Sequence, residues 1–449
     1  MFADERGHTI TTSSEAAAGS LARGMHNYLA WKADVMPHLQ AAIAADPDCA
    51  LAHISMGLII HGGRNIHFRP KLEELFRNAS RVAAGLTRRE QLYLHAFERA
   101  LAGDIAGSVA CYETILGDYP LDIFAQRMAQ MELFWIGEMD WSENISARVA
   151  PAWISTIPGH HIHLSCRAFD LEETHRYAEA ERLGRLAVEG EPTEVWGTHA
   201  VAHVLIMQNR IDEGIAWLDG LKDQWSEANQ IIFHLWWHRC LFHYERGDTE
   251  AILDYYDRWI RNREHPILKT MPDLYIDMQN GASMLLRVEL LGVDVGDRWS
   301  ELAELALNRV EDHTSPFTSA HYAAILAAAG KFEDAQRLVA SMRAFAQQDE
   351  GTFGPRYRAA VIPSAEAAIA HRKGNYDEAV DKLLPARRMI WQMGGSHAQR
   401  NVFQLIFVDA ARRAGRKDAV ALALQDAAAS GFAEAAERIG YRHAAELLN

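Results

Sequence analysis

The chain has 449 residues, of which 49% are hydrophobic and only 13 are proline, so it is expected to be globular throughout. Lys and Arg total 45 against 60 Asp and Glu, a formal net charge of -15, which repels nucleic-acid backbones and anionic lipid head groups. Neither nucleic acid nor a membrane surface is therefore an expected partner. The four cysteines are far apart without a C-x-x-C pair, which argues against a disulfide framework or structural zinc site and fits a reducing cytoplasm.

The N-terminal segment, residues 1–14, is polar and lacks the charged-then-apolar pattern of a signal peptide. It is expected to be flexible or loosely docked. No apolar run approaches the roughly 18 residues that a membrane-spanning helix needs, and the longest, residues 54–60, is expected to be part of a core helix.

A helix–turn–helix pattern recurs along the chain. In each copy a small or turn-forming residue ends one helix, and a short polar step leads into a second helix with a small residue early on its packing face. The copies are AGDIAGSVACY (102–112), THRYAEAERLG (174–184), QNRIDEGIAWL (208–218), RGDTEAILDYY (246–256), AGKFEDAQRLV (329–339), KGNYDEAVDKL (373–383) and AGRKDAVALAL (414–424). Their break residues, which recur at multiples of about 34 to 42 residues, are Gly103, His175, Asn209, Gly247, Gly330, Gly374 and Gly415. Further copies are expected at Gly62-Gly63 and within residues 290–305.

Units of this length are of the tetratricopeptide type, and each must stack on its neighbours to bury its apolar face. GKFEDA and GNYDEA match the tetratricopeptide turn, with Ala335 and Ala379 in the second helix, and Trp236 takes the aromatic position of a first helix. Small residues hold the matching position of four first helices: Ala202, Cys240, Ala323 and Ala367. The sequence predicts an all-α, right-handed superhelix (solenoid) of tetratricopeptide-like helix pairs, forming one domain over residues 1–449.

Several longer sequence segments resemble those of a known protein family. They are YLAWKADVMPHLQAAIAADPD (28–48), THAVAHVLIMQNR (198–210), FHLWWHRCLFHYERGD (233–248), LLRVELLGVDVGDRW (285–299) and GGSHAQRNVFQLIFVDAARRAG (394–415). With them the chain resembles the tetratricopeptide repeat protein 38 family from about residue 25 to residue 445. The resemblance implies a soluble, all-helical repeat protein, and it implies no particular reaction.

The break residues also fix which side chains face the concave side of the superhelix. In tetratricopeptide repeats these positions lie about 13, 10 and 6 residues before the break, one stripe at helical spacing. In one repeat they hold Trp196, His199 and His203, and in the next they begin with His234 and Trp237, followed at once by His238. We therefore expect a His- and Trp-lined groove that holds a peptide or a small polar ligand.

Two other interpretations of these histidines stay open. With 22 histidines, about one pair four residues apart is expected by chance, so imidazoles packed and hydrogen-bonded between helices would explain the pattern. A divalent metal held by the histidines, with Asp273 or Asp277 as a further ligand, is the second. HAVAH lacks the glutamate of the zinc-protease motif H-E-x-x-H, so no metal or other cofactor is predicted.

The segment GGSHAQRN (394–401) is a second candidate. In one interpretation Ser396 caps a helix; in the other, the backbone amides of the helix N-terminus, together with His397 and Arg400, hold a carboxylate or a phosphate. His321 falls near the inner stripe of its own repeat. These late residues are expected to close the far side of the groove if the superhelix curls far enough.

The leading hypothesis for function is a binding module with the ligand in this groove. The alternative is an enzyme that uses the same His-rich cavity for acid–base or metal-assisted chemistry on a small molecule. A homo-oligomeric scaffold is a third hypothesis, which the sequence neither supports nor opposes.

Overall fold

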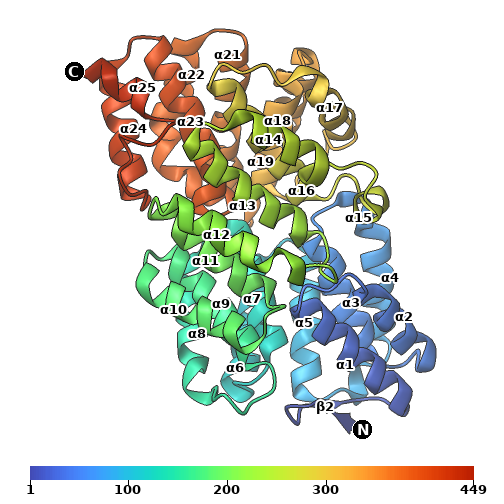
Figure 1. The fold of residues 1–449 in the computed structure, drawn as a ribbon. Helices are drawn as coiled ribbons and strands as arrows, with labels where there is room; N and C mark the ends of the chain where they lie inside the picture. Colours follow the sequence, from blue (N-terminus) through green and yellow to red (C-terminus); the bar gives the residue numbers. More distant parts are fainter. Residues whose placement is uncertain (449) are drawn as a thin grey trace. The chain divides into compact units, whose positions relative to one another are not determined.

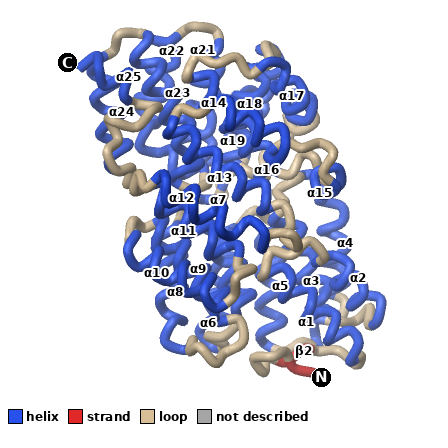
Figure 2. Tube along the Cα trace, in the orientation of Figure 1, coloured by secondary structure: helices blue, strands red, loops and turns tan. Residues whose placement is uncertain are grey.

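The computed structural model describes residues 1–448, and most of this part of the chain is helical (Figure 2). Its named strands are β1 (Phe2–Ala3) and β2 (Thr9–Ile10), which pair antiparallel near the N-terminus. The predicted all-α fold of stacked helix pairs is confirmed.

The chain divides into two compact units: Met1–Phe134, Glu138–Val201 and Leu221–Ile231 form unit 1, and Trp135–Gly137, Ala202–Gly220 and Ile232–Asn449 form unit 2. Unit 1 carries α1 (Glu15–Leu29), α2 (Val35–Ala45), α3 (Ala50–Gly62), α4 (Arg69–Ser80), α5 (Arg88–Leu101), α6 (Ile105–Asp118), α8 (Met139–Val149), α9 (His160–Glu173) and α10 (Tyr177–Gly190). Two continuous helices, α7 (Ile123–Ile136) and α11 (Val195–Met207), begin in unit 1 and end in unit 2.

Unit 2 carries the later helices, which Figure 1 colours from green to red. They are α12 (Ile211–Leu221), α13 (Ile231–Arg246), α14 (Thr249–Tyr255), α15 (Pro266–Thr270), α16 (Tyr275–Leu290), α17 (Trp299–Leu307), α18 (Pro316–Ala328), α19 (Phe332–Gln348), α20 (Phe353–Arg356), α21 (Ile362–Arg372), α22 (Tyr376–Ala386), α23 (His397–Arg413), α24 (Lys417–Ala429) and α25 (Arg442–Ala445).

The break residues explain why successive helices form hairpins. All seven predicted breaks have a positive φ, from 60° at Asn209 to 77° at Gly374, and each lies between two helices. In this left-handed conformation the chain leaves the first helix and reverses within a few residues. Within the units α5 packs on α6, α9 on α10, α21 on α22 and α23 on α24.

Both further helix–turn–helix copies that the sequence predicts are present, together with one that it does not predict. Arg64, beside Gly62-Gly63, has a φ of 48° between α3 and α4, and Gly292 has a φ of 85° between α16 and α17. A copy that was not predicted breaks at Gly137, with a φ of 76° between α7 and α8. It was missed because the second helix begins MDWSEN, without the small residue that marks the other copies.

Small side chains are needed where the two helices of a pair approach. Gly214 holds the small position of α12, and a Cβ there would lie 2.1 Å from the Phe242 ring of α13. Ala335 and Ala379 hold the matching positions of α19 and α22 and are fully buried. The hairpins therefore pack by the close-approach rule that the sequence indicates.

The N-terminal segment, expected to be flexible or loosely docked, is instead anchored to unit 1. Its Thr11 backbone N–H donates to Glu90 Oε1 at 2.8 Å, the Thr11 hydroxyl donates to Glu90 Oε2 at 2.6 Å, and Glu90 is buried. Ile10 is buried as well. A polar composition gave no sign that a buried carboxylate 79 residues away needed these donors.

Among the residues described, none of the helices combines the length and the apolar character that crossing a membrane requires.

Candidate functional site

Two first helices of neighbouring hairpins, α11 and α13, supply the predicted histidines. His203 lies six residues before the break at Asn209, and His234 and His238 lie thirteen and nine before the break at Gly247. Residues four apart share one face of a helix. His234 and His238 are therefore stacked one turn apart on α13.

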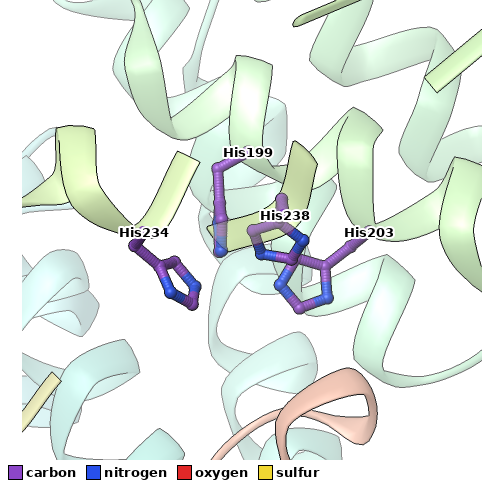
Figure 3. A group of neighbouring side chains, drawn as sticks. All are labelled: His199, His203, His234 and His238. Carbon is purple, nitrogen blue, oxygen red and sulfur yellow. The ribbon is translucent and has the colours of Figure 1, made fainter. Parts of the chain in front are cut away.

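The imidazoles of His203, His234 and His238 converge inside unit 2. Each offers a ring nitrogen, and these nitrogens lie within 4.8 Å of one another. The ring of His238 is centred 4.3 Å from that of His203 and 4.7 Å from that of His234, with interplanar angles of 57° and 79°. Figure 3 draws these three with His199, which α11 carries one turn before His203. We refer to His203, His234 and His238 as the histidine cluster.

Burial keeps His203 and His234 of the cluster neutral. It lowers the pKa of His234 to about 4, an effect that a hydrogen bond with Asn280 partly opposes. Burial also lowers the pKa of His203 well below its usual range, and the positive charges of His234, when protonated, and of Arg400 add to the effect. At neutral pH both rings are therefore neutral, the form in which an imidazole can ligate a metal.

Asn280, on α16, orients one ring of the cluster. The Nδ1–H of His234 donates to Asn280 Oδ1 at 2.9 Å, and both side chains are buried. This bond places the ring proton of neutral His234 on Nδ1, so that Nε2 is the unprotonated nitrogen. The indole of Trp237 stacks on the same imidazole at 5.0 Å and 10°, which restricts its rotation further.

Arg287, also on α16, brings an uncompensated positive charge into the same unit. Its guanidinium lies 5.7 Å from the centre of the Trp237 ring and donates to the hydroxyl and the carbonyl oxygen of Ser283 and to the Ala398 carbonyl, all neutral groups. Burial lowers the pKa of Arg287 to about 10, so it remains a cation at neutral pH.

Sequence reasoning missed both Asn280 and Arg287. Both residues lie in YIDMQNGASMLLRVEL, the first helix of a repeat. Polar side chains interrupt the apolar face of this helix, and that interruption could have identified them. Asp273, named beforehand as a metal ligand, instead pairs with Arg309 at 2.8 Å. Asp277 is buried at the start of α16.

The late candidates lie in unit 2 but form separate contacts. The Nδ1–H of His321 donates to the Phe317 carbonyl at 2.9 Å, and burial lowers the pKa of His321 to about 4. Arg400 donates to the Gly395 carbonyl and lies 3.1 Å from Nδ1 of His397. Arg400 also acts on the histidine cluster, through its charge on His203.

Ser396 caps α23. Its hydroxyl accepts from the Gln399 backbone N–H at 3.2 Å, and the Gln399 side chain accepts from the Ser396 N–H at 3.0 Å. This reciprocal capping box accounts for Ser396 through helix structure alone.

The expected open groove is not what the side chains form. Trp196, His199, His203, His234, Trp237 and His238 are all buried, none more than 4% exposed. Trp196 and His199 lie in the part of α11 that belongs to unit 1, where they stack on each other at 4.5 Å. His203, His234 and His238 of unit 2 converge, but their rings lie in the interior and not on an exposed surface.

The helix pairs and their left-handed breaks define a helical-repeat protein of the tetratricopeptide-like type. No family model matches the chain, so the likeness to the tetratricopeptide repeat protein 38 family stays a prediction. Among solved structures, the crystal structure of yeast Tom70 is similar, with 13% identity over 96% of this chain and 87% of that one and a TM-score of 0.40. A likeness of this degree says nothing about the histidine cluster.

Proposed function

We propose that this helical-repeat protein binds a divalent transition metal ion through His203, His234 and His238, which all lie in unit 2. The carrying observation is the convergence of ring nitrogens within 4.8 Å of one another. Metal binding requires deprotonated imidazoles, and the lowered pKa values of His203 and His234 supply them at neutral pH.

The spacing suits a metal after a small adjustment. With metal–nitrogen bonds of about 2.1 Å, tetrahedral ligands lie about 3.4 Å apart. Separations of up to 4.8 Å therefore have to shorten by about 1.4 Å when the metal binds. Asn280 supports this geometry, since metal-binding histidines usually donate their second N–H to an oxygen that holds the ring in place.

The donor set narrows the identity of the ion. Imidazoles without carboxylates favour zinc, copper, nickel or ferrous iron over calcium or magnesium. The positive charges of Arg287 and Arg400 weaken the binding of a bare dication and favour an ion that carries an anionic co-ligand, such as hydroxide or a carboxylate.

The binding hypothesis from the sequence thereby becomes more specific. A peptide needs an exposed groove, whereas these side chains are buried. A small ion fits such a setting. Catalysis at the centre stays a prediction, because it requires an open coordination position and a path for a substrate.

The competing explanation is that the histidines only pack the interior. Elemental analysis of protein produced in zinc-, copper-, nickel- and iron-supplemented medium separates the two. We expect close to one equivalent of one of these metals per chain. Because the ligands are buried, a chelator should remove the metal from unfolded protein much faster than from native protein.

The test variant is His234→Asn combined with His238→Asn, and the matched control is His321→Asn, which removes another buried histidine of unit 2 with a similarly lowered pKa. The double variant should lose the metal and the control should keep it. Less than about a tenth of an equivalent in the unaltered protein, or equal metal content in both variants, would overturn the proposal.

A further inference from the structure

A second group of buried polar side chains, wholly within unit 1, surrounds Arg127 on α7. Arg127 is 1% exposed, and its Nε, Nη1 and Nη2 atoms are all buried without a hydrogen-bond partner among residues 1–448. A buried guanidinium normally faces a carboxylate or several carbonyl oxygens, because an unpaired one is costly.

Two indole N–H groups beside the guanidinium are also buried without a hydrogen-bond acceptor in the described part of the chain. Trp31 and Trp196 stack at 4.8 Å and 21°, and Cζ of Arg127 lies 5.4 Å and 5.1 Å from their ring centres. The Nε1–H of each indole is buried and, within the described chain, also lacks an acceptor. Five guanidinium N–H groups and two indole N–H groups thus gather in one small region.

Neighbouring groups do not supply a negatively charged acceptor, because Cys166, which lies close enough to accept from Arg127, is a thiol whose pKa burial raises. Glu194 is near enough to feel the charge of Arg127, but its Oε1 accepts from the Trp196 backbone N–H at 3.1 Å. Burial raises the pKa of Glu194 to about 7 and that of Cys166 to about 12. Burial also raises the pKa of Tyr28 above its usual value, so the thiol and the phenol are neutral at pH 7.

Attraction between Arg127 and the aromatic rings does not remove the need for an acceptor. A buried cation–π contact contributes about 2 kcal/mol, whereas the penalty for burying an ion is several kcal/mol. Because the penalty is larger than the cation–π contribution, a negatively charged group bound beside Arg127 would stabilise this region.

Trp31 is held in place by its backbone. It has a φ of 57°, a left-handed conformation that is unusual for a tryptophan. Its carbonyl accepts from the Asn229 N–H at 2.7 Å, and Lys32 pairs with Glu227 at 2.6 Å. Trp31 is partly exposed while Arg127 and Trp196 are buried, so Trp31 is the most exposed of the three side chains.

We propose that Arg127, Trp31 and Trp196 form a binding site for a small carboxylate. A carboxylate only accepts hydrogen bonds, carries one charge and matches the guanidinium with two parallel bonds. The indole N–H groups donate to its remaining lone pairs. A phosphate shares the acceptor chemistry but brings a second charge into a buried site, which the single cation Arg127 does not balance.

Thermal unfolding and isothermal titration with sodium acetate and sodium propionate test this site, at constant ionic strength set with sodium chloride. Both carboxylates should raise the Tm of the unaltered protein. Arg127→Met should abolish the rise, and Trp31→Phe, which keeps the ring but removes the N–H donor, should weaken acetate binding about tenfold. Trp153→Phe is the matched control, because Trp153 also has a buried indole N–H without a partner in the described part of unit 1. It should bind acetate normally.

The Tm measured without added carboxylate shows whether each variant is folded. Arg127→Met should raise it or leave it unchanged, since the substitution removes an uncompensated buried charge. Equal Tm shifts in the unaltered protein and Arg127→Met, a response to chloride or inorganic phosphate instead of carboxylates, or unchanged binding in Trp31→Phe would each overturn the proposal. Metal content reports on the other unit and should be the same in all these variants.

Discussion

Replacing Asn280 by leucine tests whether a single oxygen orients the histidine cluster. The substitution removes the acceptor of the 2.9 Å hydrogen bond from Nδ1–H of His234 and leaves that buried N–H unsatisfied. The expected loss of unfolding free energy is about 1–3 kcal/mol. Without this partner the ring of His234 is free to turn Nε2 away, so zinc affinity should fall about 10- to 100-fold.

The assay is competition for zinc against a chromophoric chelator, with urea unfolding of the same samples. The control is Gln279→Leu, which removes a neighbouring buried hydrogen bond of 2.7 Å to Thr318 without touching the cluster. Both variants should lose stability, but only Asn280→Leu should lose zinc affinity. Equal zinc affinities in the two variants would refute the role given to Asn280.

Three further predictions concern stability. The pKa of His234 is lowered from 6.5 to about 4, so its neutral ring contributes full stability above pH 6.5, and about 3 kcal/mol of the unfolding free energy is lost as the pH drops to 4. His234→Gln should therefore flatten a plot of urea midpoint against pH between pH 6.5 and 4. An unchanged slope would contradict the burial of a neutral ring. The pKa of Glu194 is raised from 4.5 to about 7, so the pH dependence has the opposite sign: the contribution to stability is full below pH 4.5 and is lost as the pH rises to 7. Glu194→Gln should therefore raise the free energy of unfolding by up to about 3 kcal/mol at pH 8. The absence of such a gain would contradict the raised pKa of Glu194. Deleting residues 1–12 strips Glu90 of two hydrogen bonds from Thr11 and should lower the urea midpoint, whereas an unchanged midpoint would show that the segment is as loosely docked as its composition indicates.

The hairpins could be predicted because they depend on local rules. Residues such as Asn209 and Gly374 end helices through their own backbone conformation, and small residues such as Ala335 mark where two helices touch. Gly137 escaped notice because its second helix lacks such a marker. Local chemistry also places Ser396 as a helix cap.

The site could be predicted only in part. Helical spacing brought His234 and His238 to one face, and the phase of the hairpins brought His203 to them. Whether that face is open or filled depends on neighbours from distant repeats, and the sequence pattern does not reveal how far they intrude. Asn280 and Arg287 act through contacts between helices of different repeats, which periodicity alone does not specify.

X-ray absorption spectroscopy of the zinc-loaded protein is the most direct test of the histidine cluster as a metal centre. The proposed site predicts three or four nitrogen scatterers at about 2.0–2.1 Å, with the multiple scattering typical of imidazole and no sulfur. That pattern should disappear when His234 and His238 are both replaced by asparagine. A spectrum dominated by sulfur or by an oxygen shell, or one that the double replacement leaves unchanged, would contradict the assignment.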